Sequence, residues 1–498
     1  RRDASLRGAS RLRRLVSACI FLLATLFAGT AAAQTAADAN ELLSAWQMDE
    51  ARQMIDELAA DSSGAPSVMY LQARYAFFQG DYAEALQKIE QALNNGGSRP
   101  DWEHTRKIIE ATHEVTKDYK KFTTPEGHFE IYVEPGKDEV LVPFAGEALD
   151  KAYEAFGEEL GYYPDTPIRV EVYPSTSTLA KVSSLTDQEI RTSGTIALCK
   201  YNRLMITSPK ALLRGYGWVD TLIHEYVHSV VNSKTSNRVP IWMHEGLAKF
   251  LERRWRGPDM HRLSPSTEHL LQQRVKADDL ITFEEMHPSM AKLPSQEDAG
   301  VAFAEVYTVM EYLRENIGPD VFVDILDAIN EGYDAQQAVA KVVGKDFASF
   351  EREWRASLEK RPPVDFEESP GYREKLVFRD EAKSENELSE IEQPEARDYM
   401  HLGEMLQARE RYGAALVQYK KARRVLGNKN PILLTRMATC LRRTNKPEEA
   451  LKVVSQVKED YPGYVTGWLE MGRSALAAGK WAEARDYLRE AARINPFD

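Results

Sequence analysis

Alternating apolar and polar positions predict short β-strands in the middle of the chain. This alternation, with many β-branched and aromatic residues, covers residues 129–133 and 168–173. Between them, residues 140–160 repeat their apolar positions every three or four residues, which predicts an amphipathic helix. A further pair of strands is expected at residues 194–199 and 203–207. The first part of the central region is therefore expected to form a sheet.

Beyond residue 207 the pattern is that of helices, including residues 301–315 and 320–330. Strands followed by helices are typical of an α+β domain, which we expect to cover residues 122–361. Residues 362–395 are rich in proline and charged side chains, and this composition predicts a charged linker.

Both ends of the chain carry an internal repeat. Small residues lie twelve positions apart within each unit, and neighbouring units are 34 or 35 residues apart. These pairs are Ala39/Ala51, Ala73/Ala85, Gly403/Ala415, Ala438/Ala450 and Gly472/Ala484. The pattern resembles the tetratricopeptide repeat, in which two-helix units bury their apolar faces by stacking on neighbours. We therefore expect two all-α repeat arrays, at residues 34–121 and 396–498, with residues 102–121 as a candidate cap.

The amino terminus has the composition of a bacterial-type signal peptide. Arginines are frequent up to Arg14, an apolar run covers residues 15–29, and small residues end at Ala33. We expect residues 1–33 to be removed and the mature protein to be exported, either periplasmic or secreted. A retained transmembrane anchor is the alternative, but the apolar run is short for a bilayer span. No stable membrane span is expected after cleavage.

Charge and cysteine content narrow the classes of partner. The chain has 77 acidic and 64 basic residues and a net charge of −13, which gives no support to nucleic-acid binding. After signal cleavage only Cys199 and Cys440 remain, and they fall in different predicted domains. A disulfide framework is therefore not indicated, and both cysteines are interpreted as small buried residues.

The central helical region contains His224-Glu225-Tyr226-Val227-His228. Histidines at positions i and i+4 of a helix project from the same face and can bind one metal ion. Glu225 would then reach a metal-bound water as general base, which is the arrangement of a zinc hydrolase. The alternative is an incidental histidine pair on an exposed helix.

The third ligand would distinguish the classes of zinc peptidase. Position 234 is Lys234, where a metzincin has its third histidine, so that class is excluded. The candidates are His244 and Glu245, which follow a new helix start at Pro240. Gly246 would allow this second helix to approach another helix closely.

At this point the sequence resembles the gluzincins, also called peptidase MA-like metallohydrolases. The resemblance lies in the HExxH helix and in the Pro-x-Trp-x-x-Glu-Gly-x-Ala pattern that begins at Pro240, and it extends over about residues 122–360. It implies a thermolysin-like fold, with zinc held by His224, His228 and Glu245.

The same resemblance implies roles for two further residues. Glu225 matches the catalytic base, and Tyr307 matches a downstream tyrosine that would stabilise the oxyanion of the transition state. Lys249 is a departure, because thermolysin-like members have an acid there that orients a ligand histidine. Which residue of this chain makes that contact stays open at this stage.

These observations predict an exported zinc metallopeptidase of gluzincin type between two repeat arrays. It would hydrolyse peptide bonds by Glu225-assisted attack of zinc-bound water, and the arrays would recruit substrate or partner proteins. The strand at residues 194–199 could receive an extended peptide along its edge, although a closed internal strand is equally compatible. The alternative function is a repeat scaffold with a structural or vestigial zinc site, and hydrolysis of a non-peptide amide is a third possibility.

Overall fold

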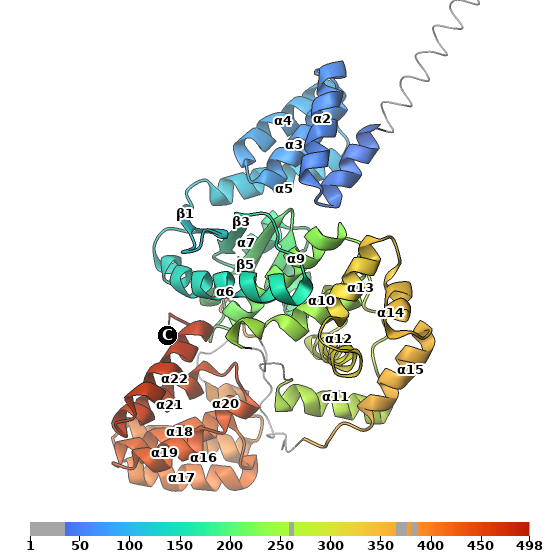
Figure 1. The fold of residues 1–498 in the computed structure, drawn as a ribbon. Helices are drawn as coiled ribbons and strands as arrows, with labels where there is room; N and C mark the ends of the chain where they lie inside the picture. The colour runs from blue at the N-terminus through green and yellow to red at the C-terminus, as the bar shows by residue number, and fades with distance from the viewer. Residues whose placement is uncertain (1–34, 258–262, 365–375, 381–386, 498) are drawn as a thin grey trace, which may run out of the picture. The chain divides into compact units, whose positions relative to one another are not determined.

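The computed structural model describes residues 35–257, 263–364, 376–380 and 387–497 (Figure 1). The signal peptide predicted at residues 1–33 lies outside these residues. The chain divides into two compact units, Arg1–Glu114 and Val115–Asp498. Among the described residues, no helix combines the length and the apolar composition needed to cross a bilayer.

The amino-terminal unit is helical, as predicted. After a helical segment at residues 35–44, its elements are α2 (Met48–Ser62), α3 (Pro66–Gln79), α4 (Tyr82–Gly96) and the start of α5 (Pro100–Thr116). The four small residues of its repeat pattern, Ala39, Ala51, Ala73 and Ala85, are fully buried. Small side chains at these positions allow the paired helices to pack closely.

A five-stranded sheet begins the second unit. Its strands are β1 (Lys120–Thr123), β2 (Phe129–Val133), β3 (Ile168–Tyr173), β4 (Ala197–Lys200) and β5 (Arg203–Thr207). The strand order is β1-β2-β3-β5-β4, with β2, β3 and β5 parallel and the two edge strands antiparallel. Tyr201 and Asn202 both have positive φ in the tight turn that joins β4 to β5.

The strands predicted at residues 129–133, 168–173 and 203–207 are confirmed, and the one predicted at 194–199 begins later, as β4. Strand β1 is not predicted by the sequence, and it crosses the expected boundary between residues 121 and 122. It is short and mostly exposed, so its residues carry little alternation of apolar and polar positions.

Helices cover the sheet and continue the domain beyond it (Figure 1). Those before the motif are α6 (Val142–Leu160), α7 (Thr176–Val182) and α8 (Asp187–Ser193). Those that follow are α9 (Trp218–Thr235), α10 (Ile241–Leu251), α11 (Pro265–Ala277), α12 (Gln296–Ile317), α13 (Val321–Asn330), α14 (Ala335–Val343) and α15 (Phe347–Leu358). Helix α9 packs against β4, β5 and α6. The predicted α+β class and the predicted helices are confirmed.

The close approach of α10 and α12 depends on Gly246. A Cβ atom at this position would lie 2.8 Å from Cε of Met310 and 3.0 Å from the carbonyl oxygen of Val306. Helix α10 starts directly after Pro240, as the sequence suggested. Pro240 therefore determines where α10 begins, and Gly246 determines how closely α10 packs on α12.

The carboxy-terminal array also follows the predicted repeat. After a short 3-10 helix, η5 (Glu387–Glu390), its helices are α16 (Pro394–Ala408), α17 (Tyr412–Leu426), α18 (Pro431–Arg443), α19 (Pro447–Val454), α20 (Val457–Asp460), α21 (Val465–Ala477) and α22 (Trp481–Ile494). A Cβ atom at Gly472 would lie 2.6 Å from the Leu488 side chain, and one at Gly403 would overlap Tyr419. Larger residues would therefore separate the helices of each hairpin.

The end of this array contacts the start of α9 within the same unit. Arg256 donates to Asp220 of α9 at 2.9 Å and to Glu490 of α22 at 2.9 Å. The backbone N–H of Tyr216 donates to the carbonyl oxygen of Ile494 at 3.1 Å. Because Asp220 lies one turn before His224, these contacts bring the array next to the helix that carries the motif.

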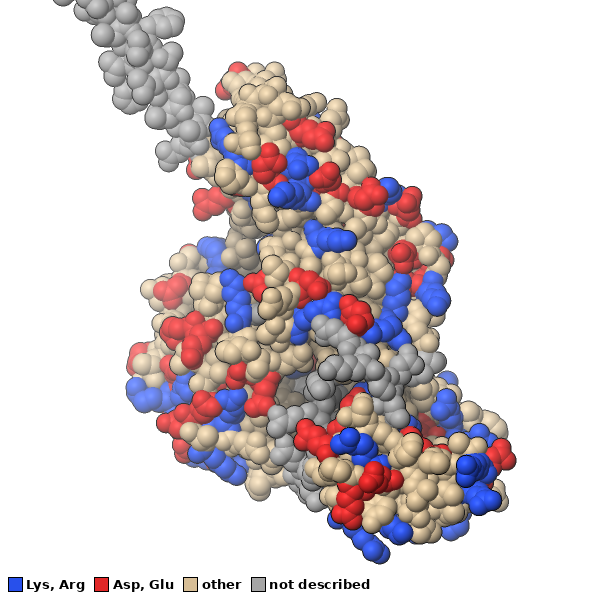
Figure 2. Space-filling view, turned by 180° about the vertical axis from the view of Figure 1, so that it is seen from behind, with Lys and Arg blue, Asp and Glu red and all other residues tan. Residues whose placement is uncertain are grey.

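Acidic and basic side chains are interspersed on the face shown in Figure 2. No extended area of this face, where its residues are described, is covered by Lys and Arg alone. A duplex-binding surface is typically a basic stripe or patch, so this face lacks the usual feature of one.

Candidate metal centre

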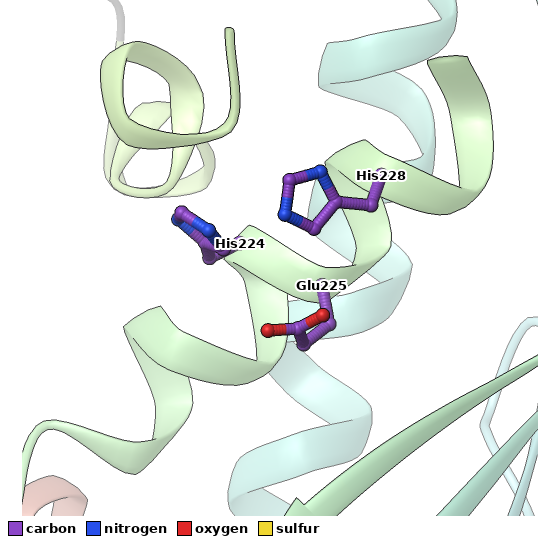
Figure 3. Close-up of side chains that lie close together, drawn as sticks. All are labelled: His224, Glu225 and His228. Carbon is purple, nitrogen blue, oxygen red and sulfur yellow. The ribbon is translucent and has the colours of Figure 1, made fainter. Parts of the chain in front are cut away.

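Helix α9 brings His224, Glu225 and His228 together (Figure 3). One nitrogen or oxygen atom from each of the three side chains lies within 4.8 Å of the other two. The other side of α9 is apolar, and its residues Val227 and Val230 are fully buried. Because this apolar side packs on the sheet and α6, the polar side is held in a fixed direction.

Glu245 of α10 completes a three-residue cluster with the two histidines. Its Oε2 atom lies 3.1 Å from Nε2 of His224 and 3.4 Å from Nε2 of His228. Burial would raise the pKa of Glu245, but the neighbouring histidines lower it, so this side chain is a carboxylate. The three atoms that meet here are the types that zinc prefers.

The separations within this cluster fit a zinc ion. Ligand atoms about 2.0–2.1 Å from a tetrahedral zinc lie roughly 3.3 Å from one another. Burial by itself would lower the pKa of His224, but hydrogen bonds to Glu245 and Glu252 raise it to about 10. The two carboxylates around His224 thus favour a positive charge between them.

Glu252 orients the ring of His224. Its Oε2 atom lies 3.2 Å from Nδ1 of His224, and its Oε1 atom accepts a hydrogen bond from Lys249 at 2.6 Å. Burial would raise the pKa of Glu252, but Lys249 and His224 lower it to about 2. The ionised carboxylate accepts a hydrogen bond from Nδ1–H of His224 and leaves Nε2 of that ring directed at Glu245. Glu252 therefore provides the orienting carboxylate that this chain lacks at position 249.

His228 is oriented by a different pair of residues. Its Nδ1 atom lies 2.6 Å from Nδ1 of His244, and Nε2 of His244 lies 2.8 Å from Oδ1 of Asn232. An amide oxygen only accepts, so Nε2 of His244 carries the proton and its Nδ1 accepts from His228. Burial lowers the pKa of His244 to about 3, which keeps it neutral. Nε2 of His228 then faces the carboxylate of Glu245, 3.4 Å from its Oε2 atom.

Glu225 lies beside the cluster and is held by the sheet. Its side chain is buried. Burial raises the pKa of Glu225, whereas the two histidines lower it by a smaller amount. Its carboxylate accepts a hydrogen bond from the backbone N–H of Cys199 on the edge strand β4. A basic carboxylate with a fixed orientation is suited to taking up a proton.

Tyr307 lies on α12 and lines the same cavity as the histidines. Its hydroxyl donates to Glu311 at 3.4 Å, and its ring packs on Phe250 with the ring centroids 5.5 Å apart. Only 2% of its surface is exposed, and burial raises the pKa of its hydroxyl. The structure therefore places Tyr307 at the cavity with its hydroxyl bonded to Glu311.

A cavity of about 920 Å³ surrounds these groups. Strand β4 lines one part of it, and the ligand candidates of α9 and α10 line another. Trp468 and Tyr487 of the carboxy-terminal array line it as well, although they lie more than two hundred residues beyond the motif. The volume is large enough for several residues of an extended peptide.

The orienting residues were not identified from the sequence, although their spacing offered a signal. Glu252 follows Glu245 by seven residues, and Asn232 follows His228 by four, so each pair shares a helical face. The sequence offers His244 only as a candidate metal ligand, whereas in the structure it contacts His228. That contact depends on how α9 and α10 cross, which the spacing within one helix does not determine.

Comparison with known proteins gives matches to two families. Residues 145–360 match the model of the Peptidase MA superfamily, and residues 36–101 and 435–498 match that of the tetratricopeptide repeat. No curated protein matches the sequence.

Among solved structures, similarity is found to leukotriene A4 hydrolase of the yeast Saccharomyces cerevisiae. The native enzyme and its complex with bestatin are each 13% identical to this chain, and the alignments cover 76% of it with TM-scores of 0.31. The chain spans 62% of the native enzyme's length and 67% of that in the complex. Similarity at this level carries no conclusion about the activity of this chain.

Proposed function

We propose, on the premise that residues 145–360 form a Peptidase MA superfamily domain flanked by tetratricopeptide repeats, that this protein is a zinc metallopeptidase of gluzincin type. The observation that carries the proposal is the meeting of His224, His228 and Glu245 at one point, with Glu225 beside them. A structural zinc site would close its fourth position and would not need Glu225.

Zinc would be held by Nε2 of His224, Nε2 of His228 and the carboxylate of Glu245. When bound, the ion would lower the pKa of water and polarise the carbonyl group of the substrate. Glu252 and His244 would hold the two imidazoles in the tautomer that offers Nε2. The orientation of the two imidazoles would therefore be determined by Glu252 and His244, which would not themselves bind the metal.

Glu225 would act as the general base. Its carboxylate would take a proton from the attacking water, whose oxygen bonds to the carbonyl carbon of the substrate. It would then pass this proton to the nitrogen of the leaving amine as the scissile C–N bond breaks, with no net gain or loss of protons. The hydrogen bond from the backbone of Cys199 keeps the carboxylate turned towards the edge strand. Proton transfer and substrate placement would thus depend on the same strand.

Strand β4 is suited to bind the substrate. It is the last strand in the sheet order, it pairs only with β5 among the described strands, and it lines the cavity. An extended peptide could add to its open edge by backbone hydrogen bonds, which would place a peptide bond close to Glu225. This arrangement favours an unfolded segment of a protein as the substrate.

We also propose that the protein is exported and that its repeat arrays bind other proteins. Cleavage of a signal peptide after Ala33 would release a periplasmic or secreted enzyme, and a mature chain that begins at Gln34 in mass spectrometry is the result this requires. The repeat arrays would bind substrate or partner proteins, as stacked helical repeats commonly do.

Cleavage of casein tests the proposed activity. The purified protein should release peptides, a chelator should stop the release, and added zinc should restore it. A protein that contains zinc and cleaves neither casein nor any other unfolded substrate would favour the alternative, a repeat scaffold with a structural zinc site.

Loss of the Tyr307 hydroxyl should reduce turnover if this group stabilises the oxyanion. We expect Tyr307→Phe to lower kcat by about 10²-fold with little change in KM, because one oxyanion donor contributes about 10²–10³ in kcat. Steady-state kinetics on a fluorogenic peptide measure both values. A change of less than twofold in kcat would make Tyr307 a packing residue.

Loss of the Glu252 carboxylate should weaken zinc binding. We expect Glu252→Leu to raise the Kd for zinc by about 10–100-fold, because the residues that orient a ligand histidine contribute an effect of that size. Competition with a chelating dye measures this constant. Lys249→Met removes the ion-pair partner and leaves the acceptor of His224 in place, so it should change the Kd much less. Equal effects of the two substitutions would contradict the orienting role.

A further inference from the structure

The inner face of the carboxy-terminal array contains a groove with several arginines. It is lined by α16, α18 and α21, the first helices of the three repeats, and it has a volume of about 510 Å³. Its arginines are Arg436, Arg442, Arg443 and Arg473. Four arginines thus line this groove with one carboxylate, Glu470, in a chain whose net charge is −13.

One end of this groove already holds a carboxylate from the same chain. Glu387 of η5 accepts hydrogen bonds from Arg436 at 2.8 Å, from the hydroxyl of Tyr464 at 2.7 Å and from Thr466 at 3.2 Å. Only 7% of the surface of Glu387 is exposed. The array therefore contains a formed carboxylate site, in which an acidic residue that precedes the repeats is bound by their inner face.

The other arginines of the groove differ in their partners. Arg442 forms two hydrogen bonds with Glu470, at 2.7 Å and 3.0 Å, and its charge is thereby compensated. Arg443 and Arg473 have exposed side chains, and no carboxylate of the described residues forms an ion pair with either of them. Arg443 lies 5.9 Å from the ring centroid of Tyr412, a contact that leaves its N–H groups available.

We propose that this groove binds an acidic peptide segment of a partner or substrate protein. Arg443 and Arg473 would bind carboxylates of the segment, because a guanidinium group offers paired donors that match a carboxylate. Gln407 and Thr439, which also line the groove, would bind the backbone of the segment. This inference specifies the partner of the recruitment described under the proposed function, but the binding itself needs neither zinc nor hydrolysis.

Peptide binding by the full-length mature chain tests the inference. The probe is a fluorescein-labelled decapeptide of alternating glutamate and serine, and the control peptide has glutamine in place of each glutamate. Fluorescence anisotropy is measured in the presence of a chelator, so that cleavage does not remove the probe. We expect at least tenfold tighter binding of the glutamate peptide than of the glutamine peptide, with an affinity that falls as salt is added.

Charge reversal locates the binding site. The double variant Arg443→Glu/Arg473→Glu should weaken binding of the glutamate peptide by at least tenfold. A matched double variant, Arg424→Glu/Arg485→Glu, changes the net charge equally at exposed positions of α17 and α22 outside the groove, and it should bind as the wild type does. Equal losses in the two double variants would contradict the inference, and so would equal affinity for the two peptides. Equally tight binding of a single-stranded oligonucleotide of the same charge would point to phosphate recognition instead.

Discussion

Replacing Glu225 by glutamine is expected to abolish measurable peptide hydrolysis and to leave zinc bound. Glutamine has nearly the same shape as glutamate and can still accept the hydrogen bond from the backbone of Cys199, but it takes up no proton at neutral pH. General acid–base catalysis by one side chain contributes about 10²–10⁴ in rate, so turnover should fall by at least that factor. The proposed metal ligands His224, His228 and Glu245 are untouched by the substitution.

Three measurements on the Glu225→Gln variant separate catalysis from folding. Zinc content is determined by elemental analysis, folding by thermal unfolding, and turnover with a fluorogenic peptide. Glu315→Gln makes the same chemical change at an exposed position of α12 and should keep full activity. Undiminished turnover in the Glu225 variant would show that another group acts as the base.

Removing either of two predicted zinc ligands is expected to release the metal. In His228→Ala and Glu245→Ala the cluster loses one of its three atoms, of which Oε2 of Glu245 lies 3.1 Å and 3.4 Å from the two imidazole nitrogens. The loss in zinc affinity should exceed the roughly 10–100-fold that removal of an orienting residue causes, because a direct ligand is lost. Hydrolysis should disappear with the metal.

Zinc content after dialysis against a weak chelator measures this loss. His401→Ala is the matched control, because His401 is exposed on α16, far along the chain from the cluster, and its removal should leave zinc content unchanged. Full zinc occupancy in the Glu245 variant would exclude Glu245 from the ligand set. His244 would then become the candidate for the third ligand, as the sequence allowed.

The meeting of His224, His228 and Glu245 could be predicted because its signals are local. The i, i+4 spacing of His224 and His228 places both on one face of any helix, and Pro240 and Gly246 mark the start and the close packing of the next one. The sheet was predicted where its strands alternate strongly. It was missed at β1, whose polar residues form a strand only because β2 offers an edge for pairing.

The remainder of the site depends on contacts between distant parts of the chain. The interaction of His244 with His228 arises from the crossing of α9 and α10, and the contribution of Trp468 and Tyr487 to the cavity arises from packing of the last repeats. Neither contact has a periodic pattern in the sequence. The role of Glu252 is only partly predictable. Its spacing from Glu245 indicates a shared helical face but not which imidazole it contacts.

A crystal structure with zinc, analysed by anomalous diffraction at the zinc absorption edge, tests the central claim most directly. We predict one strong anomalous peak about 2.0–2.2 Å from Nε2 of His224, Nε2 of His228 and a carboxylate oxygen of Glu245. The fourth position should be open to the cavity, with Glu225 beside it but outside the ligand set. A peak bound through His244 in place of Glu245, or a zinc ion whose four positions are all filled by protein atoms, would contradict the account.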